Sequence, residues 1–228
     1  MIMGDIALLG ETMTNEGIAL LEGNLQALAD QIYYGTDTGG FSGYNTLLDS
    51  SMTVSANSTV ASGTAYTGVY FVHTGIKGVQ FVGGNSTALE LGDVYQQDIT
   101  DENGKTFRAY NQRMRGWYGL QAAATKCLGK LEKVTDSLTQ EMMASVLAKF
   151  PNITKPNAIF MNRNVFFNCW IPERAKVGLL KNGNTRLTIE SSFENAAVDS
   201  FMGIPVYVSD AIKDDETPSA SANTDGQS

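Results

Sequence analysis

Residues that carry catalysis are sparse in this chain of 228 amino acids, which has a single histidine, His73. A Ser–His–Asp or Cys–His arrangement would have to use it, yet His73 lies in an apolar, strand-like run without a GxSxG motif nearby. A core or interface histidine is the better interpretation. The two cysteines, Cys127 and Cys169, lie far apart and outside any CxxC or metal-ligand spacing, which is typical of buried free thiols. The sequence therefore predicts that the protein is not an enzyme.

Motif spacing also argues against a nucleotide or metal site. The loop Gly35–Gly40 is rich in glycine but lacks the lysine of a P-loop, and it follows a helix, whereas a phosphate cradle precedes one. Asp98, Asp101 and Glu102 are out of register for a calcium loop, because Ile99 would occupy its first position. A zinc site would need a cluster of cysteine and histidine that the sequence does not contain. We expect neither a metal nor a cofactor.

One stretch combines basic and aromatic side chains: Arg108, Arg113, Arg115, Trp117 and Tyr118. Such a strand could contact nucleic acid through phosphates and stacked bases. The alternative is that the arginines form ion pairs within a sheet or between subunits. The formal net charge of -8 favours the alternative, because the chain as a whole repels phosphate. We therefore take these five residues as a candidate subunit interface.

This stretch must be positioned by the second arm of a β-hairpin. Asn103-Gly104 between two β-prone runs is a strong hairpin signal, because both residue types tolerate positive φ. The second arm runs from Lys105 to Leu120 and mixes polar and aromatic side chains on both faces. That mixture indicates a strand with neighbours or partners on both sides.

The longest predicted element is a helix over residues 14–34, with Thr14 as N-cap and Gly35 as the left-handed stop. Gly23 inside it suggests that another segment packs close to the backbone. The apolar residues that recur every three or four positions along one stripe are Ile18, Leu21, Leu25, Leu28 and Ile32. Such a stripe is typical of a helix that backs a sheet.

The remaining patterns predict an α+β fold with a mixed sheet. We expect helical structure over 121–131 and a helix opened by the capping box Ser137–Gln140 and stopped by Pro151. Asn162 should cap a third helix. Strands are expected at Asp5–Leu9, within Tyr66–Val82, and at Asn157–Met161, Leu187–Ile189 and Phe201–Val208. From Lys213 onward the low-complexity sequence predicts a disordered tail, residues 213–228. Neither a signal peptide nor a membrane span is indicated, which makes a cytoplasmic origin the default.

Taken in order, these segments resemble the major capsid proteins of tailed bacteriophages, which have the Hong Kong 97-type fold, and the short-tailed-phage coat proteins among them. In that family a long spine helix ends in a glycine-rich loop. The stretches that carry the resemblance are Ile32-Tyr-Tyr-Gly35, Gly40-Phe-Ser-Gly-Tyr44, Thr67-Gly-Val-Tyr-Phe-Val72, Phe107-Arg-Ala-Tyr110, Trp117-Tyr-Gly-Leu120, Asn157-Ala-Ile-Phe-Met-Asn-Arg163 and Gly203-Ile-Pro-Val-Tyr-Val-Ser-Asp-Ala-Ile212.

The resemblance implies a structural subunit of an icosahedral phage or prophage capsid that acts by self-association and encloses the genome. Residues 1–212 would form one capsid-like domain in which peripheral and axial regions interleave around the spine helix. Its partners would be copies of itself in pentamers and hexamers, together with portal, scaffold or decoration proteins, and it would contact packaged DNA only loosely. It would lie in the virion capsid, and in the bacterial host cytoplasm during assembly. The family's N-terminal arm and E-loop precede the spine helix, so we expect this sequence to lack them.

Two other functions remain open at this point. An encapsulin-like nanocompartment shell would share the same fold. A β-rich carbohydrate-binding module would use Trp117, Tyr118 and Tyr110 as a stacking platform.

Overall fold

The computed structural model describes residues 3–36, 38, 40–57, 65–83, 90–173 and 200–216. The chain divides into two compact units, one made of Met1–Gln80 with Ala122–Ser228 and the other of Phe81–Gln121. Among the described helices, none is both long and apolar enough to cross a bilayer.

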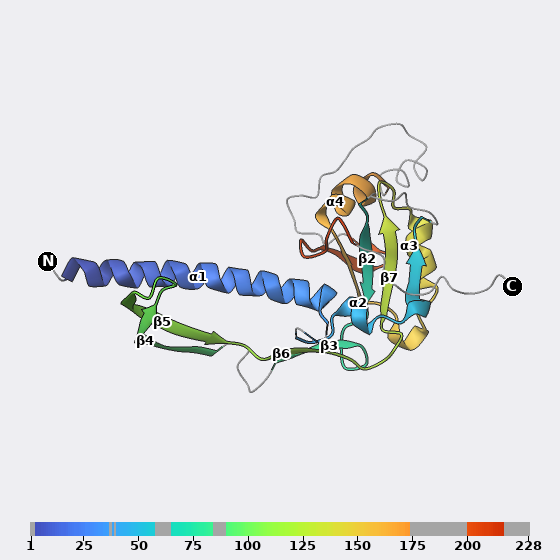
Figure 1. Cartoon of the computed structure of the whole chain (residues 1–228). Helices are drawn as coiled ribbons and strands as arrows, with labels where there is room; N and C mark the ends of the chain where they lie inside the picture. The colour runs from blue at the N-terminus through green and yellow to red at the C-terminus, as the bar shows by residue number, and fades with distance from the viewer. Residues whose placement is uncertain are drawn as a thin grey trace. The chain divides into compact units, whose positions relative to one another are not determined.

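A six-stranded mixed sheet forms the centre of the first unit (Figure 1). The strand pairs β7–β2, β2–β8 and β10–β9 are antiparallel, whereas β1–β7 and β8–β10 are parallel. In spatial order the strands are β1 (Thr53–Ser55), β7 (Leu128–Val134), β2 (Thr67–Val72), β8 (Ala158–Met161), β10 (Ile204–Val208) and β9 (Ser200–Phe201). The α+β class with a mixed sheet is thus confirmed.

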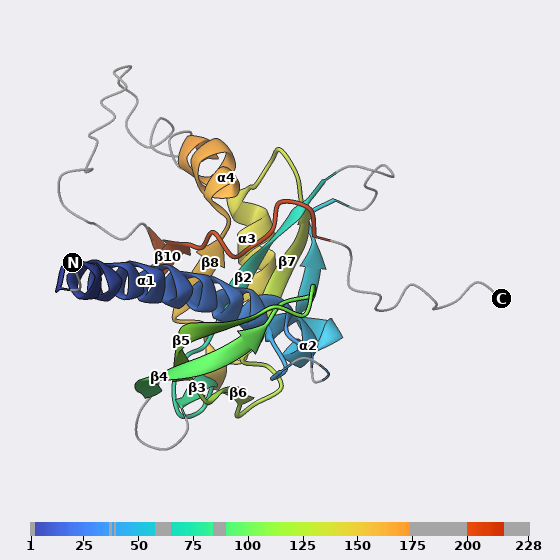
Figure 2. The same ribbon diagram turned by 60° about the vertical axis from the view of Figure 1, so that its left-hand side comes forward.

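The core lies between this sheet and the helices on one of its faces. Strand β2 is buried along its whole length, as expected for a central strand that is apolar on both faces. Helix α3 (Gln140–Leu147) packs on β1 and β7 (Figure 2) and contributes Met143 and Val146 to the core. The short helix α4 (Arg163–Val165) continues into the π-helical turn η3 (Phe166–Trp170), which contributes the buried Trp170. The 3₁₀ turns η1 (Ser50–Met52) and η2 (Asn152–Thr154) complete the connections.

Helix α1 (Met3–Tyr34) is longer than the sequence predicted. The run Asp5–Leu9, expected to be a strand, is helical, and Thr14 lies inside the helix rather than at its cap. Short apolar runs do not by themselves distinguish a strand from a helix, which explains the error. A Cβ added at Gly23 would meet no atom within 4 Å, so the predicted close packing there is wrong for the single chain.

Helix α1 ends at the predicted position, but the cause is not a left-handed conformation of Gly35. Gly35 follows the last helical residue and its N–H donates to the carbonyl of Gln31 at 2.9 Å. Gly35 is not among the residues with positive φ. Instead, a Cβ at this position would clash with the carbonyl oxygens of Gln31 and Phe41. The chain can therefore fold back tightly into α2 (Tyr44–Leu47) only because residue 35 lacks a side chain.

The helical stretch predicted over residues 121–131 is wrong. These residues form the end of β6 (Tyr118–Ala122), a turn flanked by bends and the start of β7. Because β7 pairs with both β1 and β2, backbone pairing in the sheet overrides the helix propensity of alanine.

Two predicted helix starts are present in the structure. The Asn162 side chain caps α4 by accepting a hydrogen bond from the N–H of Asn164 at 2.7 Å. Helix α3 is capped by Thr139 rather than by Ser137, because the Thr139 hydroxyl accepts from the N–H of Met142. The strand expected at residues 187–189 lies outside the described residues.

The second unit is built on a long hairpin of β4 (Glu90–Thr100) and β5 (Thr106–Arg115) (Figure 1). Its turn forms at the predicted position, with Gly104 at φ +78. The Asp101 carboxylate stabilises the turn by accepting from the N–H groups of Asn103 and Lys105 at 2.9 and 2.7 Å. A second two-stranded sheet, β3 (Val79–Gly83) with β6, lies where the two units join along the sequence.

Candidate subunit interface

Arg108 is the one candidate interface arginine with a partner in its own sheet. Its Nε donates to Asp98 Oδ1 at 3.1 Å, directly across the hairpin. Both side chains are largely exposed to solvent, so this ion pair contributes little to stability. Arg108 therefore corresponds to the intra-sheet alternative that the sequence left open.

Arg113 and Arg115 lie on the other face of β5, because they differ from Arg108 in strand parity. Both are exposed, and neither forms an ion pair with a residue that the structure describes. Trp117, between β5 and β6, is 65% exposed. Tyr118 is half-buried and stacks on Phe81 with ring centroids 5.5 Å apart. The five candidate residues therefore do not form one cluster, and Tyr118 packs within the sheet of β3 and β6.

The face of Arg113 and Arg115 also carries apolar side chains that the sequence analysis did not single out. Ile99 on β4 pairs with Phe107 on β5. Tyr95, four positions before Ile99 along β4, lies on the same face of the hairpin. All three apolar side chains are well exposed, Phe107 by 52%. Tyr95 and Ile99 have the same parity along β4, but only the register of the hairpin shows that they share a face with Phe107. We call Tyr95, Ile99, Phe107, Arg113 and Arg115 the hairpin face.

Helix α1 exposes a second set of apolar side chains. Ile18 and Leu25, which the periodicity assigned to a packed stripe, are 53% and 54% exposed. Leu20 is exposed to a similar degree. Only from Leu28 to the helix end are most side chains partly or fully buried. Of the predicted stripe, Leu21, Leu28 and Ile32 are partly buried and the other two residues remain exposed to solvent in the described part of the chain.

An aromatic cluster holds the end of α1 on the central sheet. Tyr33 is buried and its ring lies 5.4 Å from that of Tyr44 in α2 and 5.2 Å from that of Tyr70 in β2, measured between centroids. Burial raises the pKa of Tyr33 to about 12, because the ionised phenolate would lose its hydration. These three rings form the packing contact between helix and sheet.

A set of polar side chains, which we call the polar cluster, lies beside these rings: Tyr34, Asn45, Tyr70, Lys130 and Glu216. Lys130 Nζ lies 2.8 Å from Glu216 Oε2, and the two side chains are only 3% and 2% exposed. The hydroxyls of Tyr34 and Tyr70 lie 2.6 and 2.8 Å from Glu216 Oε1. Burial, together with the nearby Glu216, raises the pKa of both tyrosines, so both hydroxyls keep their protons.

The polar cluster explains why residue 68 is a glycine, and it shows that the first part of the predicted tail is folded. A Cβ at Gly68 would lie 2.6 Å from Lys130 Cε and 2.8 Å from Glu216 Oε2, so only glycine leaves room for the pair. Glu216 is buried and its N–H donates to the Tyr66 carbonyl at 2.8 Å. Residues 213–216 thus belong to the folded unit, not to a tail, while residues 217–228 lie outside the described residues. Sequence reasoning missed Lys130 and Glu216 because charged residues are usually exposed.

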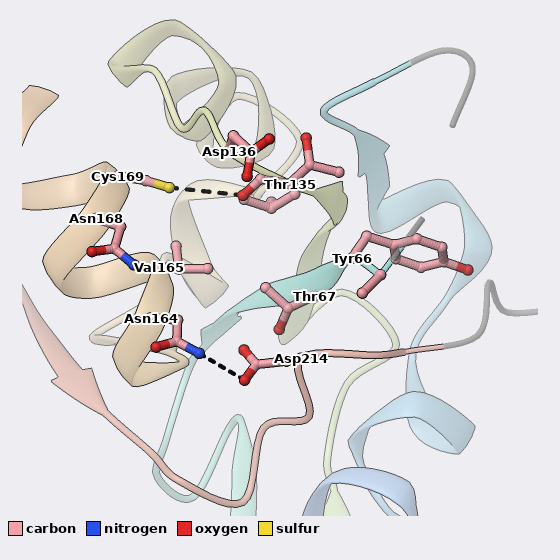
Figure 3. Close-up of a pocket in the computed structure, with 11 residues that line it drawn as sticks. Tyr66, Thr67, Thr135, Asp136, Asn164, Val165, Asn168, Cys169 and Asp214 are labelled. Carbon is pink, nitrogen blue, oxygen red and sulfur yellow. Dashed lines mark hydrogen bonds between the residues drawn. The ribbon is translucent and has the colours of Figure 1, made fainter. Parts of the chain in front are cut away.

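A cavity of about 470 Å³ lies between the start of β2, the end of β7 and the helix α4–η3 (Figure 3). Its polar lining is tied together by the Asn164 amide, which donates to Asp214 at 2.7 Å. The lining includes one thiol, that of Cys169. Burial raises the pKa of this thiol, and so does the nearby Asp136. A raised pKa favours the protonated thiol, which is a poor nucleophile.

His73 makes a structural contact. Its Nδ1 lies 2.6 Å from the carbonyl oxygen of Lys155, to which it donates a hydrogen bond. This bond joins the end of β2 to the segment after η2. It matches the interpretation of His73 as a core or interface residue better than a catalytic role.

Comparison with known proteins shows similarity to a protein family and to a solved capsid structure. The family model described as Major capsid protein GP7 matches residues 10–220. A chain from the near-atomic-resolution cryo-EM structure of bacteriophage Epsilon15 matches with a TM-score of 0.61 and 18% sequence identity, covering 90% of this chain and 67% of that chain. Comparison with curated proteins gives no match.

These matches decide between the functions that the sequence left open. The Epsilon15 chain supports the fold, and the family match favours a capsid subunit over a nanocompartment shell or a carbohydrate-binding module. The resemblance to phage major capsid proteins is confirmed. Because the family model matches most of its length, this chain belongs to the major capsid protein GP7 family and is a structural subunit of a bacteriophage capsid.

Proposed function

We propose that copies of this chain associate with one another, as pentamers and hexamers, into an icosahedral shell that encloses the phage genome. The observation that carries the proposal is the exposure of large apolar side chains on the hairpin face and on α1. Contiguous exposed apolar surface is characteristic of protein interfaces. A two-stranded hairpin is also only marginally stable alone in water, which favours a hairpin that packs against something else.

The chemistry of the hairpin face suits a protein partner. Aromatic residues and arginine are the types enriched at interface centres, and Phe107 and Trp117 provide exposed aromatic anchors. Arg113 and Arg115 can each bind a carboxylate with two parallel hydrogen bonds. With 24 acidic against 16 basic residues, a second copy of the chain offers many such carboxylates. We therefore keep Arg113, Arg115 and Trp117 as contact residues between subunits and assign Arg108 and Tyr118 a lesser part.

The finer features of a capsid subunit complete the proposal. Helix α1 acts as the spine helix that ties peripheral and axial regions into one plate. The subunit has no enzymatic activity, and its inner face touches DNA only loosely, because a net charge of -8 opposes tight phosphate binding. It assembles in the host cytoplasm, where it meets portal, scaffold or decoration proteins.

Sedimentation velocity and negative-stain microscopy of the full chain over a range of concentrations test this proposal. We expect particles much larger than one subunit, in a proportion that rises with concentration. Arg113→Glu with Arg115→Glu should shift the onset of assembly to higher concentration. Arg108→Ala is the matched control, because its partner lies in its own sheet, and should change the onset little. A chain that stays monomeric at the highest concentration would contradict the proposal.

A further inference from the structure

Four exposed lysines gather at one end of the central sheet, and we call this surface the lysine end: Lys77, Lys126, Lys149 and Lys155. Strand β2 finishes at this end, whereas β1, β7 and β8 begin here. Lys126 directly precedes the turn into β7, and its carbonyl accepts a hydrogen bond from the Thr154 hydroxyl in η2 at 2.9 Å. The carbonyl of Lys155, just after η2, contacts the ring of His73 at the end of β2.

The other two lysines belong to the same end of the sheet. Lys77 lies in the turn that follows His73, and a backbone hydrogen bond of 2.8 Å to the His73 carbonyl closes that turn. Lys149 follows α3, and its Nζ donates to the carbonyls of Ser51 and Thr53, at the start of β1, at 2.9 and 2.7 Å. The four side chains therefore come from three separate segments, which only the tertiary structure brings together.

The lysine end carries positive charge that the chain itself does not neutralise. None of the four lysines forms an ion pair with a residue that the structure describes. The neighbouring Asp49 instead accepts a hydrogen bond from the N–H of Ser51 at 2.9 Å. The other described basic residues of the first unit all have partners: Lys130 with Glu216, Lys133 with Glu132, Arg163 with Asp210, and Lys213 over the ring of Tyr34. Unpaired cations on a chain of net charge -8 indicate a surface for a negatively charged partner.

Apolar side chains at the lysine end favour a protein as that partner. Ile76, beside Lys77, is 87% exposed, and Ile153 in η2 is 75% exposed. Protein–protein interfaces combine apolar contacts with a polar rim, whereas surfaces that bind DNA are more polar. The lysine end therefore fits an acidic protein surface that also exposes apolar side chains.

Helix α1 has that composition. It contains no lysine or arginine, and its five acidic residues are Asp5, Glu11, Glu16, Glu22 and Asp30. The last three of these are exposed, and none of them forms an ion pair with a described residue. Glu22 lies four positions after Ile18 and three before Leu25, so a carboxylate and two exposed apolar side chains share one face of the helix.

Two other arrangements between copies are less favourable. Packing α1 against α1 would bring like charges together, which is costly at an interface. The carboxylates at the opposite end of the central sheet are partly engaged, because Asp210 binds Arg163 and Asp214 accepts from Asn164. Helix α1 is thus the acidic surface with the most unpaired charge to offer.

We infer that α1 of one subunit docks on the lysine end of a neighbouring subunit. Glu16, Glu22 and Asp30 pair with the lysines, while the apolar side chains of α1 cover Ile76 and Ile153. This inference rests on the proposed self-association and deepens it by naming two surfaces that meet. Because exposed ion pairs are screened by salt, association through this contact weakens as ionic strength rises.

Carbodiimide crosslinking of an equal mixture of unlabelled and heavy-nitrogen-labelled full chain tests the inference. The reagent joins an amine to a carboxylate that touches it, and light–heavy peptide pairs identify bonds between copies. We expect such pairs to join Glu16, Glu22 or Asp30 to lysines of the lysine end. Sedimentation velocity of the same samples reports association. Association without these pairs would overturn the inference and leave the proposed assembly standing, whereas a chain that neither associates nor crosslinks would contradict both.

Charge reversal tests the pairing of the two surfaces. Lys126→Glu with Lys155→Glu should raise the concentration of half-maximal association at low salt by about tenfold or more, because like charges then face each other. Glu16→Lys with Glu22→Lys should have the same effect, and all four substitutions in one chain should recover association. Lys105→Glu, at the hairpin tip, is the matched control for charge and should change association little. Circular dichroism shows whether each variant is folded. Folded single-surface variants that associate like wild type, or no recovery in the combined chain, would contradict the contact.

The same variants separate this contact from one with nucleic acid. Fluorescence anisotropy of a labelled DNA duplex measures binding to the wild-type chain and to Lys126→Glu with Lys155→Glu. We expect the two chains to bind the duplex with similar affinity. A loss of DNA binding in the variant, with association unchanged, would assign the lysine end to the packaged genome and overturn the inference.

Discussion

Tyr33 is predicted to be the main anchor of α1 on the central sheet. It is buried between the rings of Tyr44 and Tyr70, whereas the side chains before Leu28 are mostly exposed. Removing a buried aromatic side chain costs about 3 to 5 kcal/mol. Tyr33→Ala should therefore destabilise the packed end of α1 by about 3 kcal/mol or more, while the sheet core around Val69 and Leu131 stays intact.

Hydrogen exchange followed by mass spectrometry measures this effect locally. A loss of about 3 kcal/mol corresponds to a rise of roughly 100-fold in the exchange rate of protected amides near the end of α1. Tyr33→Phe is the matched control, because it keeps the ring and loses only the hydroxyl, which bonds to the Ser209 side chain. One hydrogen bond is worth about 1 kcal/mol, so this variant should stay close to wild type. Equal effects of Tyr33→Ala and Tyr33→Phe, or no effect of Tyr33→Ala, would refute the packing argument.

Four further predictions concern stability and reactivity. Gly68→Ala should lower the free energy of unfolding by about 1 to 3 kcal/mol in chemical denaturation, because its Cβ would crowd the buried amine and carboxyl groups. Gly23→Ala, in open surroundings on α1, should instead raise helix stability by up to about 1 kcal/mol; a loss at this site would show that something packs there. Because the pKa of Tyr33 is raised to about 12, the folded chain keeps a proton that the unfolded chain loses above about pH 10. Thermal melts should therefore show a stability contribution that is complete below pH 10 and lost as the pH rises toward 12, and Tyr33→Phe should reduce that loss. Since burial raises the pKa of the Cys169 thiol, iodoacetamide should label it slowly at pH 8 in the native chain and quickly in denaturant; equal rates would contradict its burial.

Several local features could be predicted because their causes lie within a few residues. Asn103-Gly104 marked the hairpin turn, although only Gly104 adopts positive φ. Asn162 and the end of α1 before Gly35 were also found, since a cap and a helix stop depend on neighbouring backbone groups. The start of α1 and the strand β7 were missed, because short apolar or alanine-rich runs fit more than one kind of element.

The candidate interface was predicted in part. The sequence pointed to the strand that carries Arg113, Arg115 and Trp117, and their exposure agrees with a contact surface. Tyr95 and Ile99 were missed because they lie on the partner strand, and only the register shows that they share the face of Phe107. That these residues contact another subunit stays a prediction.

The sequence by itself determined the order of helices and strands at the motifs that resemble capsid proteins, and it indicated the family. These are properties of short segments, whose turn residues, caps and apolar periods act locally. Only the tertiary structure decided which apolar faces are covered and which charges are buried. Ile18 and Leu25 follow a core pattern yet stay exposed, whereas Lys130 and Glu216 look like surface residues yet meet in the interior. Burial depends on segments distant in the chain, so local pattern cannot specify it.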